Sequence, residues 1–130
     1  MKKLFLFLLF LIGVTLSACS SSSDSAIQTV DLKTAIQMMK ESDNYLIVDV
    51  RTSREFDSGH IENAINIDNN LIQKANQPLA QLPDTDQTIF IYCRSGNRSS
   101  QAAKKLESLG YTSIIDFGVM QNWDGDLITQ

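Results

Sequence analysis

Thr88-Ile89-Phe90-Ile91-Tyr92-Cys93-Arg94-Ser95-Gly96-Asn97-Arg98 is the run of this sequence that carries the most structural information. Its first five residues are all β-branched or aromatic, which is typical of a buried strand. From about Ser99, apolar residues recur with helical spacing until Gly110, a residue type that commonly ends helices. The run therefore predicts a strand, a short loop and a helix, with Cys93 where the strand ends.

Short apolar segments alternate with amphipathic segments over the rest of the chain. Strands are expected at residues 27–30, 45–48, 64–67, 88–92 and 112–116. Helices are expected at residues 31–40, 53–57, 71–75 and 99–109, with a turn at residues 59–61 and a closing turn or helix around Trp123. Because strands and helices alternate, the predicted fold class is α/β, with a central, mainly parallel sheet flanked by helices on both faces.

The first residues have the pattern of an export signal. Lys2 and Lys3 precede an apolar run over residues 4–16, which is short for a transmembrane helix. The run ends in Leu16-Ser17-Ala18-Cys19, which resembles the bacterial lipobox, whose cysteine becomes the lipidated N-terminus. We interpret residues 1–18 as a lipoprotein signal peptide and residues 19–26 as the lipidated Cys19 with a serine-rich tether.

This interpretation predicts a protein that is exported and lipid-anchored to a bacterial membrane, on the periplasmic face or at the cell surface. The alternatives are an ordinary signal peptide with an incidental cysteine, or an uncleaved anchor.

Charge and cysteine content limit the possible functions. The chain has 15 acidic residues against 11 Lys and Arg, a net charge of −4 and no basic run, which argues against nucleic acid as a partner. It has 2 cysteines. If Cys19 carries lipid, Cys93 is the remaining thiol and no intramolecular disulfide can form. No metal or cofactor is expected.

The position of Cys93 between a strand and a helix indicates a reactive thiol. Ligands of parallel α/β sheets bind at the carboxyl ends of the strands. Amides of the loop and of the first helical turn have no intrahelical acceptor, and the helix dipole adds positive potential, so both favour a thiolate. Arg94 and Arg98 add two positive charges. A thiolate in these surroundings suits a reaction with an anionic, soft electrophile.

Six motifs in order resemble the rhodanese (thiosulfate sulfurtransferase) family in its single-domain form. They are Asp49-Val50-Arg51, Glu55-Phe56, Gly59-His60-Ile61, Ala64-Ile65-Asn66-Ile67, the loop from Cys93 to Arg98, and Gly118 before Trp123. Each motif is weak by itself, but their order and spacing make the resemblance specific. It covers about residues 27–123, so residues 27–130 are interpreted as one rhodanese-like domain.

Two positions depart from the family pattern. Asn63 replaces a glycine after the Gly-His-Ile motif, and Val119 replaces the second of two paired glycines. Asparagine tolerates a positive φ, so we expect the first turn to be preserved. Valine disfavours a positive φ, so we expect the turn that carries Met120 and Trp123 to follow a different path.

The resemblance implies a sulfurtransferase in which Cys93 attacks a sulfane sulfur and holds it as a persulfide. It implies a small anionic donor such as thiosulfate, and as acceptor either cyanide or a thiol, from a small molecule or a thioredoxin-like protein. Loop amides would stabilise the thiolate and the persulfide, and Arg94 and Arg98 would bind the sulfonate end of the donor. The loop residues concerned are Arg94, Ser95, Gly96, Asn97, Arg98 and Ser99.

Other interpretations of these residues stay open at this stage. Cys93 could be a packed, inert thiol, and one arginine could face solvent or pair with an acid. Asp49 and Arg51 are interpreted as a network that braces the loop. His60 is interpreted as a structural hydrogen-bonding residue and not as a general base, because transfer from a thiolate needs none.

Two other classes of protein would use a similar loop. A cysteine phosphatase or an arsenate reductase also holds an oxyanion on backbone amides, but it places an arginine six residues after the cysteine, where this chain has Ser99. A non-enzymatic sulfur-binding, anion-binding or sensor module could use the same fold without turnover.

The lipobox predicts that fatty-acid labelling of a bacterial host will label the full-length protein, and that labelled protein will partition into detergent. The reason is that each buried methylene contributes about 0.8 kcal/mol, so several acyl chains hold firmly. The matched control is Cys19→Ser, which should carry no label. Wild-type protein that is soluble and unlabelled would contradict the prediction.

Overall fold

The computed structural model describes residues 24–130, so the predicted signal peptide, Cys19 and most of the tether lie outside the described residues. Within the described part, no helix has the length and apolar character needed to cross a bilayer.

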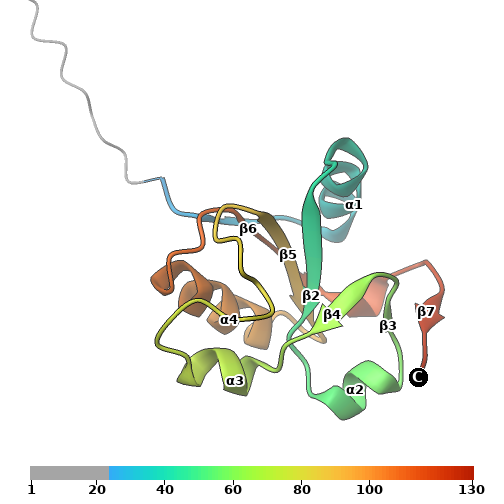
Figure 1. Ribbon diagram of the computed structural model, residues 1–130. Coiled ribbons are helices and arrows are strands. Elements are labelled where there is room, and N and C mark those ends of the chain that lie inside the picture. The colour runs from blue at the N-terminus through green and yellow to red at the C-terminus, as the bar shows by residue number, and fades with distance from the viewer. Residues whose placement is uncertain (1–23) are drawn as a thin grey trace, which may run out of the picture.

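Five strands form one parallel sheet in the order β1-β6-β5-β2-β4 (Figure 1). Their bounds are β1 (Ile27–Thr29), β2 (Tyr45–Asp49), β4 (Ala64–Asn66), β5 (Thr88–Cys93) and β6 (Ile114–Val119). Because all five strands run in one direction, their carboxyl ends lie at the same edge of the sheet. The predicted α/β class with a mainly parallel sheet is confirmed.

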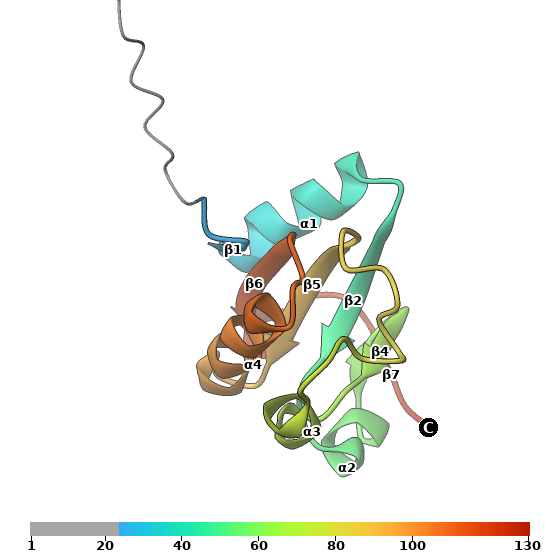
Figure 2. The same cartoon turned by 60° about the vertical axis from the view of Figure 1, so that its left-hand side comes forward.

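Helices cover both faces of this sheet (Figures 1 and 2). The helix α1 (Leu32–Glu41) lies on one face, and α3 (Asn69–Lys74) and α4 (Asn97–Ser108) lie on the other. Alternate residues of β5 point to opposite faces of the sheet, one covered by α1 and the other by α3 and α4. Phe90 packs in the α1 layer with Ala35, whereas Ile89 and Ile91 pack in the α4 layer with Leu106, and all are fully buried.

Smaller elements lie near the carboxyl edge of the sheet. The helix α2 (Ser53–Asp57) begins with a capping box, in which Thr52 and Glu55 bond each other's backbone amides. A two-stranded antiparallel sheet follows, formed by β3 (His60–Ile61) and β7 (Leu127–Ile128). Between β6 and β7 lies the 3₁₀ helix Met120–Asn122, with Trp123 as its C-cap.

The elements differ from the predicted ones mainly at their ends. The predicted turn at residues 59–61 instead contains β3, because the end of the chain returns and pairs His60 with Ile128. The helix α4 begins at Asn97, and β6 continues to Val119 instead of ending at residue 116. The limits of β3 and β6 depend on pairing with distant strands, so local periodicity could not show them.

The two departures from the family pattern are accommodated differently. Asn63 adopts a φ of 64°, the positive value expected there. Val119 has an extended backbone with φ −111° and ψ 108°, while Gly118 before it takes the positive φ of 64°. The β-branched residue is therefore not strained.

Candidate active site

The carboxyl ends of four strands bring the candidate residues together. Asp49 at the end of β2 lies opposite Asn66 of β4, and Cys93 at the end of β5 lies opposite Val119 of β6. The loop after Cys93 then leads directly into α4. The site is thus placed where ligands of parallel sheets bind.

The cysteine loop folds back onto the sulfur. The backbone N–H of Gly96 donates a hydrogen bond to Sγ of Cys93 at 3.0 Å. This requires a φ of 93° at Gly96, a left-handed conformation that glycine adopts without a Cβ clash. Gly96 also precedes the first residue of α4, so the sulfur lies at the positive end of a 12-residue helix.

The loop rests on the strand β6 through two glycines. A Cβ added to Gly118 would lie 3.3 Å from the Cα of Gly96, which is tighter than an ordinary contact. The absence of a side chain at Gly118 therefore lets the backbones of the loop and of β6 approach this closely.

The Cys93 side chain is fully buried, with 0% exposure. Its Sγ also lies 3.7 Å from Oγ of Ser99, which is itself fully buried and donates to the carbonyl of Gly96 at 3.1 Å. The sulfur is therefore not accessible to solvent in this conformation of the loop.

Arg98 is held by an acid. Its guanidinium donates to both carboxylate oxygens of Glu55, at 2.7 and 2.9 Å. The hydrogen bond from Arg98 is the largest cause that lowers the pKa of Glu55, from 4.5 to about 2. Because Glu55 also accepts from the backbone and hydroxyl of Thr52, the ion pair ties the first turn of α4 to α2. Of the two arginines, Arg98 is therefore the one that pairs with an acid, as one of the alternative interpretations had it.

The other polar loop residues point outward. Arg94, Ser95 and Asn97 are exposed. Within residues 24–130, Arg94 forms no ion pair. Its charge is therefore available to a ligand that approaches the loop from solvent.

Asp49 and Arg51 form a buried ion pair beneath the site. The Arg51 guanidinium binds the carboxylate at 2.6 to 3.0 Å and also donates to the carbonyl of Gly59 at 2.7 Å. The pKa of Arg51 is raised: burial opposes the charge, but the hydrogen bond and the charge of Asp49 outweigh it. The amide of Asn66 caps the backbone carbonyls of both residues. This network braces the strand ends.

His60 is also buried and engaged. Its Nδ1 lies 2.8 Å from the carbonyl of Phe56, so this nitrogen carries the hydrogen and donates. The imidazole stacks on the Phe56 ring, with centroids 3.6 Å apart and planes 10° from parallel. Through these contacts His60 connects β3 to α2, which is a structural role.

Two residues of the site had no role in the sequence-based interpretation. Glu55 was noted in a motif, but its pairing with Arg98 was not expected. Asp116 was expected as the end of a strand, and it is buried in β6 next to the cysteine loop. The sequence signal that could have indicated a role for Asp116 was its position between Ile115 and Phe117, as the one charged residue in an otherwise apolar strand.

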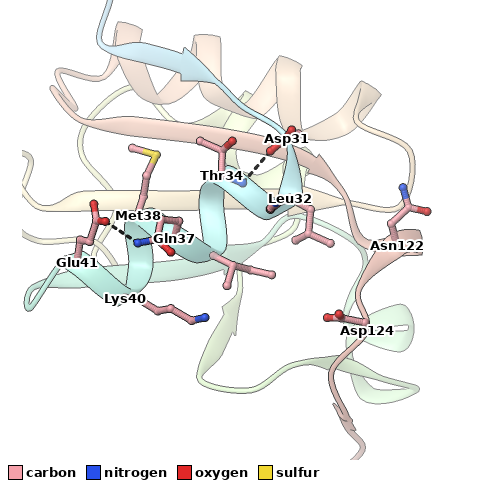
Figure 3. Close-up of a pocket in the computed structure, with 11 residues that line it drawn as sticks. Asp31, Leu32, Thr34, Gln37, Met38, Lys40, Glu41, Asn122 and Asp124 are labelled. Carbon is pink, nitrogen blue, oxygen red and sulfur yellow. Dashed lines mark hydrogen bonds between the residues drawn. The ribbon is translucent and has the colours of Figure 1, made fainter.

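Cys93 lines neither of two cavities found in the described part of the chain. One of about 370 Å³ is bounded by Gly96, Ser100, Asp116 and Gly118. A larger one of about 1090 Å³ runs along α1 (Figure 3). Gln37 and Glu41 of this helix share a hydrogen bond, and Asn122 and Asp124 line the cavity from the segment after β6. No loop residue lines the larger cavity, so we do not assign the chemistry to it. Among the described residues, no group of three or more His, Cys, Asp and Glu side chains could hold a metal.

A parallel α/β fold with a cysteine loop at a strand-helix junction defines a class of cysteine-loop proteins. Within this class, the sequence model of the family described as Rhodanese-like domain matches residues 31–124 of the chain. The chain belongs to the rhodanese-like domain family.

Individual relatives agree with this assignment. The thiosulfate sulfurtransferase PspE of Escherichia coli is 30% identical over 76 residues, which are 58% of this chain and 70% of that protein. The adenylyltransferase and sulfurtransferase UBA4 of Candida albicans is 34% identical over 75% of this chain, which spans only 23% of that longer protein. The solved structure of a rhodanese-like domain protein from Staphylococcus aureus covers 79% of this chain and 98% of its own, with 28% identity and a TM-score of 0.65.

The Glu55–Arg98 pair predicts acid-dependent stability. Since the folded-state pKa of Glu55 is about 2 and its usual value is 4.5, the pair stabilises the fold above pH 4.5, and this contribution is lost as the pH falls toward 2. In urea unfolding measured against pH, Glu55→Gln should be less stable than wild type at pH 7 and lose less stability on acidification. The control Glu62→Gln changes an exposed acid on a neighbouring turn and should behave like wild type. Identical pH dependence of wild type and Glu55→Gln would contradict the prediction.

Proposed function

We propose that this protein is a sulfurtransferase that moves a sulfane sulfur from an anionic donor such as thiosulfate to a thiol or cyanide, through a persulfide on Cys93. The observation that carries the proposal is the 3.0 Å hydrogen bond from the Gly96 amide to Sγ, at the N-terminus of α4. The membership of the rhodanese-like family and the similarity to named sulfurtransferases support it.

In the first half-reaction, the Cys93 thiolate attacks the outer sulfur of thiosulfate. The new bond joins Sγ to that sulfur, the bond between the two donor sulfurs breaks, and sulfite leaves with the electron pair. The total charge is unchanged, so no proton transfer is needed. The Gly96 amide and the helix N-terminus stabilise the anionic sulfur before and after transfer, in the manner of an oxyanion hole.

In the second half-reaction, a thiolate or cyanide attacks the outer persulfide sulfur. The acceptor gains that sulfur as a persulfide or as thiocyanate, and Cys93 leaves as the thiolate. If the acceptor arrives as a thiol, its proton is released to solvent. The two steps give ping-pong kinetics.

The two loop arginines contribute differently to this proposal. Arg98 is bound to Glu55 on both oxygens, so it holds the loop in shape. Arg94 is exposed at the same loop, and its guanidinium suits a planar or multi-oxygen anion. We therefore assign recognition of the sulfonate end of the donor to Arg94.

The place of action follows from the lipobox at Cys19. We propose that the domain acts outside the cytoplasm on a lipid anchor, where thioredoxin-like proteins or small thiols would accept the sulfur.

Incubation of the domain with thiosulfate should add one sulfur atom to Cys93 and release an equal amount of sulfite. Intact-mass measurement detects the adduct, which should persist until cyanide or a thiol is added, because no second thiol of the described part can resolve it. Cys93→Ser should lose the adduct and turnover. A stable adduct without transfer to any acceptor would favour a storage or sensor module instead, and hydrolysis of a phosphate ester without any adduct would defeat the proposal.

Arg94→Ala should raise the KM for thiosulfate by roughly 10- to 150-fold, the equivalent of one charge-assisted hydrogen bond of about 1.5–3 kcal/mol. Use of an alkyl persulfide, which has no sulfonate group and releases an alkyl thiolate, should change little. The matched control is Lys104→Ala, which removes an exposed cation farther along α4. Equal KM values for thiosulfate in the two variants would contradict the role of Arg94.

A further inference from the structure

Asp116 is a buried carboxyl beneath the cysteine loop that the two half-reactions above do not use. It is 5% exposed. In the sheet it pairs with Ile91 of β5, and Ile91 and Cys93 both face the α4 layer. Its strand neighbours Ile115 and Phe117 face the other layer. Asp116 therefore lies on the same face of the sheet as the reactive sulfur, under the first turn of α4.

One oxygen of this carboxyl lacks a hydrogen-bond partner. Oδ1 of Asp116 is buried and bonded to no atom of the described residues. Oδ1 and the hydroxyl oxygen of Ser99 lie on the same side of Gly118, since a Cβ built at Gly118 would lie 3.8 Å from each of them. A buried polar atom without a partner is costly, so this arrangement calls for a state in which Oδ1 is bonded.

The Ser99 hydroxyl connects this oxygen to the sulfur. With Cys93 as a neutral thiol, the S–H points to Ser99 Oγ at 3.7 Å, and Ser99 donates its own hydrogen to the Gly96 carbonyl at 3.1 Å. Once Cys93 loses its proton, the sulfur can only accept. The Ser99 hydrogen is then better placed on the sulfur, and the Ser99 oxygen is left as an acceptor facing Asp116.

We propose that Asp116 is a positioning residue for the sulfurtransferase: its protonated carboxyl donates to Ser99 Oγ and so directs the Ser99 hydroxyl toward the anionic sulfur of Cys93. The chain of donors is Asp116 Oδ–H to Ser99, and Ser99 O–H to the thiolate or persulfide. This assignment rests on the proposed function and adds a second donor beside the Gly96 amide. It also gives the orphaned Oδ1 its partner.

The surroundings of Asp116 favour the protonated form of its carboxyl. Burial raises the pKa of Asp116, and the hydroxyl of Ser99 and the amide of Gly118 only partly oppose this rise. The charges nearby offer no compensation. The strand β1 has no titratable residue, and those of β5 are Cys93 and Tyr92, of which Tyr92 packs in the other layer. The positive charge of Arg98 on α4 is paired with Glu55. Asp31 before α1 lines the same 370 Å³ cavity and is itself an acid.

A protonated carboxyl is also what the chemistry requires. An ionised Asp116 would place a second negative charge near the thiolate in a buried site. Two acidic groups close together do not both ionise readily, because their negative charges repel each other. An ionised carboxylate would moreover accept the Ser99 hydrogen and withdraw it from the sulfur.

The test is the rate of Cys93 alkylation by iodoacetamide against pH, which reports the thiolate without any sulfur donor. Asp116→Ala and Ser99→Ala should each raise the midpoint by about one pH unit, a tenfold loss of thiolate at a fixed lower pH. The double variant should shift no further than the larger single one, because both residues act in one chain. Asp116→Asn keeps a neutral donor of the same shape and should stay close to the wild-type midpoint.

Asp31→Asn is the matched control, since it neutralises the other carboxylate at the same cavity and keeps a good N-cap for α1. Its midpoint should equal that of wild type. An unshifted Asp116→Ala or Ser99→Ala overturns the proposal, as does an Asp116→Asn midpoint that moves as far as that of Asp116→Ala. Additive shifts in the double variant also overturn it. If Asp116→Ala does not fold, an unshifted Ser99→Ala midpoint overturns the proposal, and so does an Asp116→Asn midpoint that rises as far as that of Ser99→Ala.

The outcome is separable from that of the proposed function. Failure of wild-type protein to form a persulfide leaves the alkylation midpoints measurable. Conversely, if wild type forms the persulfide and the midpoints do not move, only the role of Asp116 fails. If both hold, Asp116→Ala should also form the persulfide about tenfold more slowly than wild type below the midpoint.

Discussion

The hydrogen bond from the Gly96 amide to the Cys93 sulfur is the interaction on which the site depends. It exists because Gly96 takes a left-handed φ of 93°, and because the loop can rest against the backbone of Gly118. The first turn of α4 starts at this point, so one conformation sets both the amide that faces the sulfur and the helix dipole behind it. A side chain at Gly118 would crowd the backbone of Gly96, and a side chain at Gly96 would be strained by the left-handed φ.

The surrounding structure holds this loop from three directions. Glu55 on α2 binds Arg98 from the outer side, with its own position set by the capping box of Thr52. Asp49 and Arg51 brace the neighbouring strand end through a buried ion pair that also reaches Gly59. Asp116 and Ser99 lie on the inner side. Polar groups are therefore concentrated at the carboxyl edge of the sheet, whereas the two cores that support it are apolar.

Most of the fold could be predicted from local pattern. The run from Thr88 to Arg98 indicated a strand, a loop and a helix in the correct order, and Gly110 indicated the helix end, where it takes a φ of 96°. The pairing of β3 with β7 could not be predicted, because two-residue strands have no periodicity and their partner lies at the far end of the sequence. For the candidate site, residue types and spacing placed Cys93 and its loop, but not what each loop residue contacts.

The sequence by itself determined the α/β class, the cysteine at a strand-helix junction and the membership of the rhodanese-like family, because spacing and hydrophobic period are local properties of the chain. Only the tertiary structure decided which charges are engaged. Arg98 and Arg94 look equivalent in the sequence, yet the first meets Glu55 from another element and the second faces solvent. Asp116 looks like a strand end, yet the sheet register buries it beside Ser99. Burial and pairing depend on contacts between distant segments, and these set the charge and the hydrogen bonds of every group in the site.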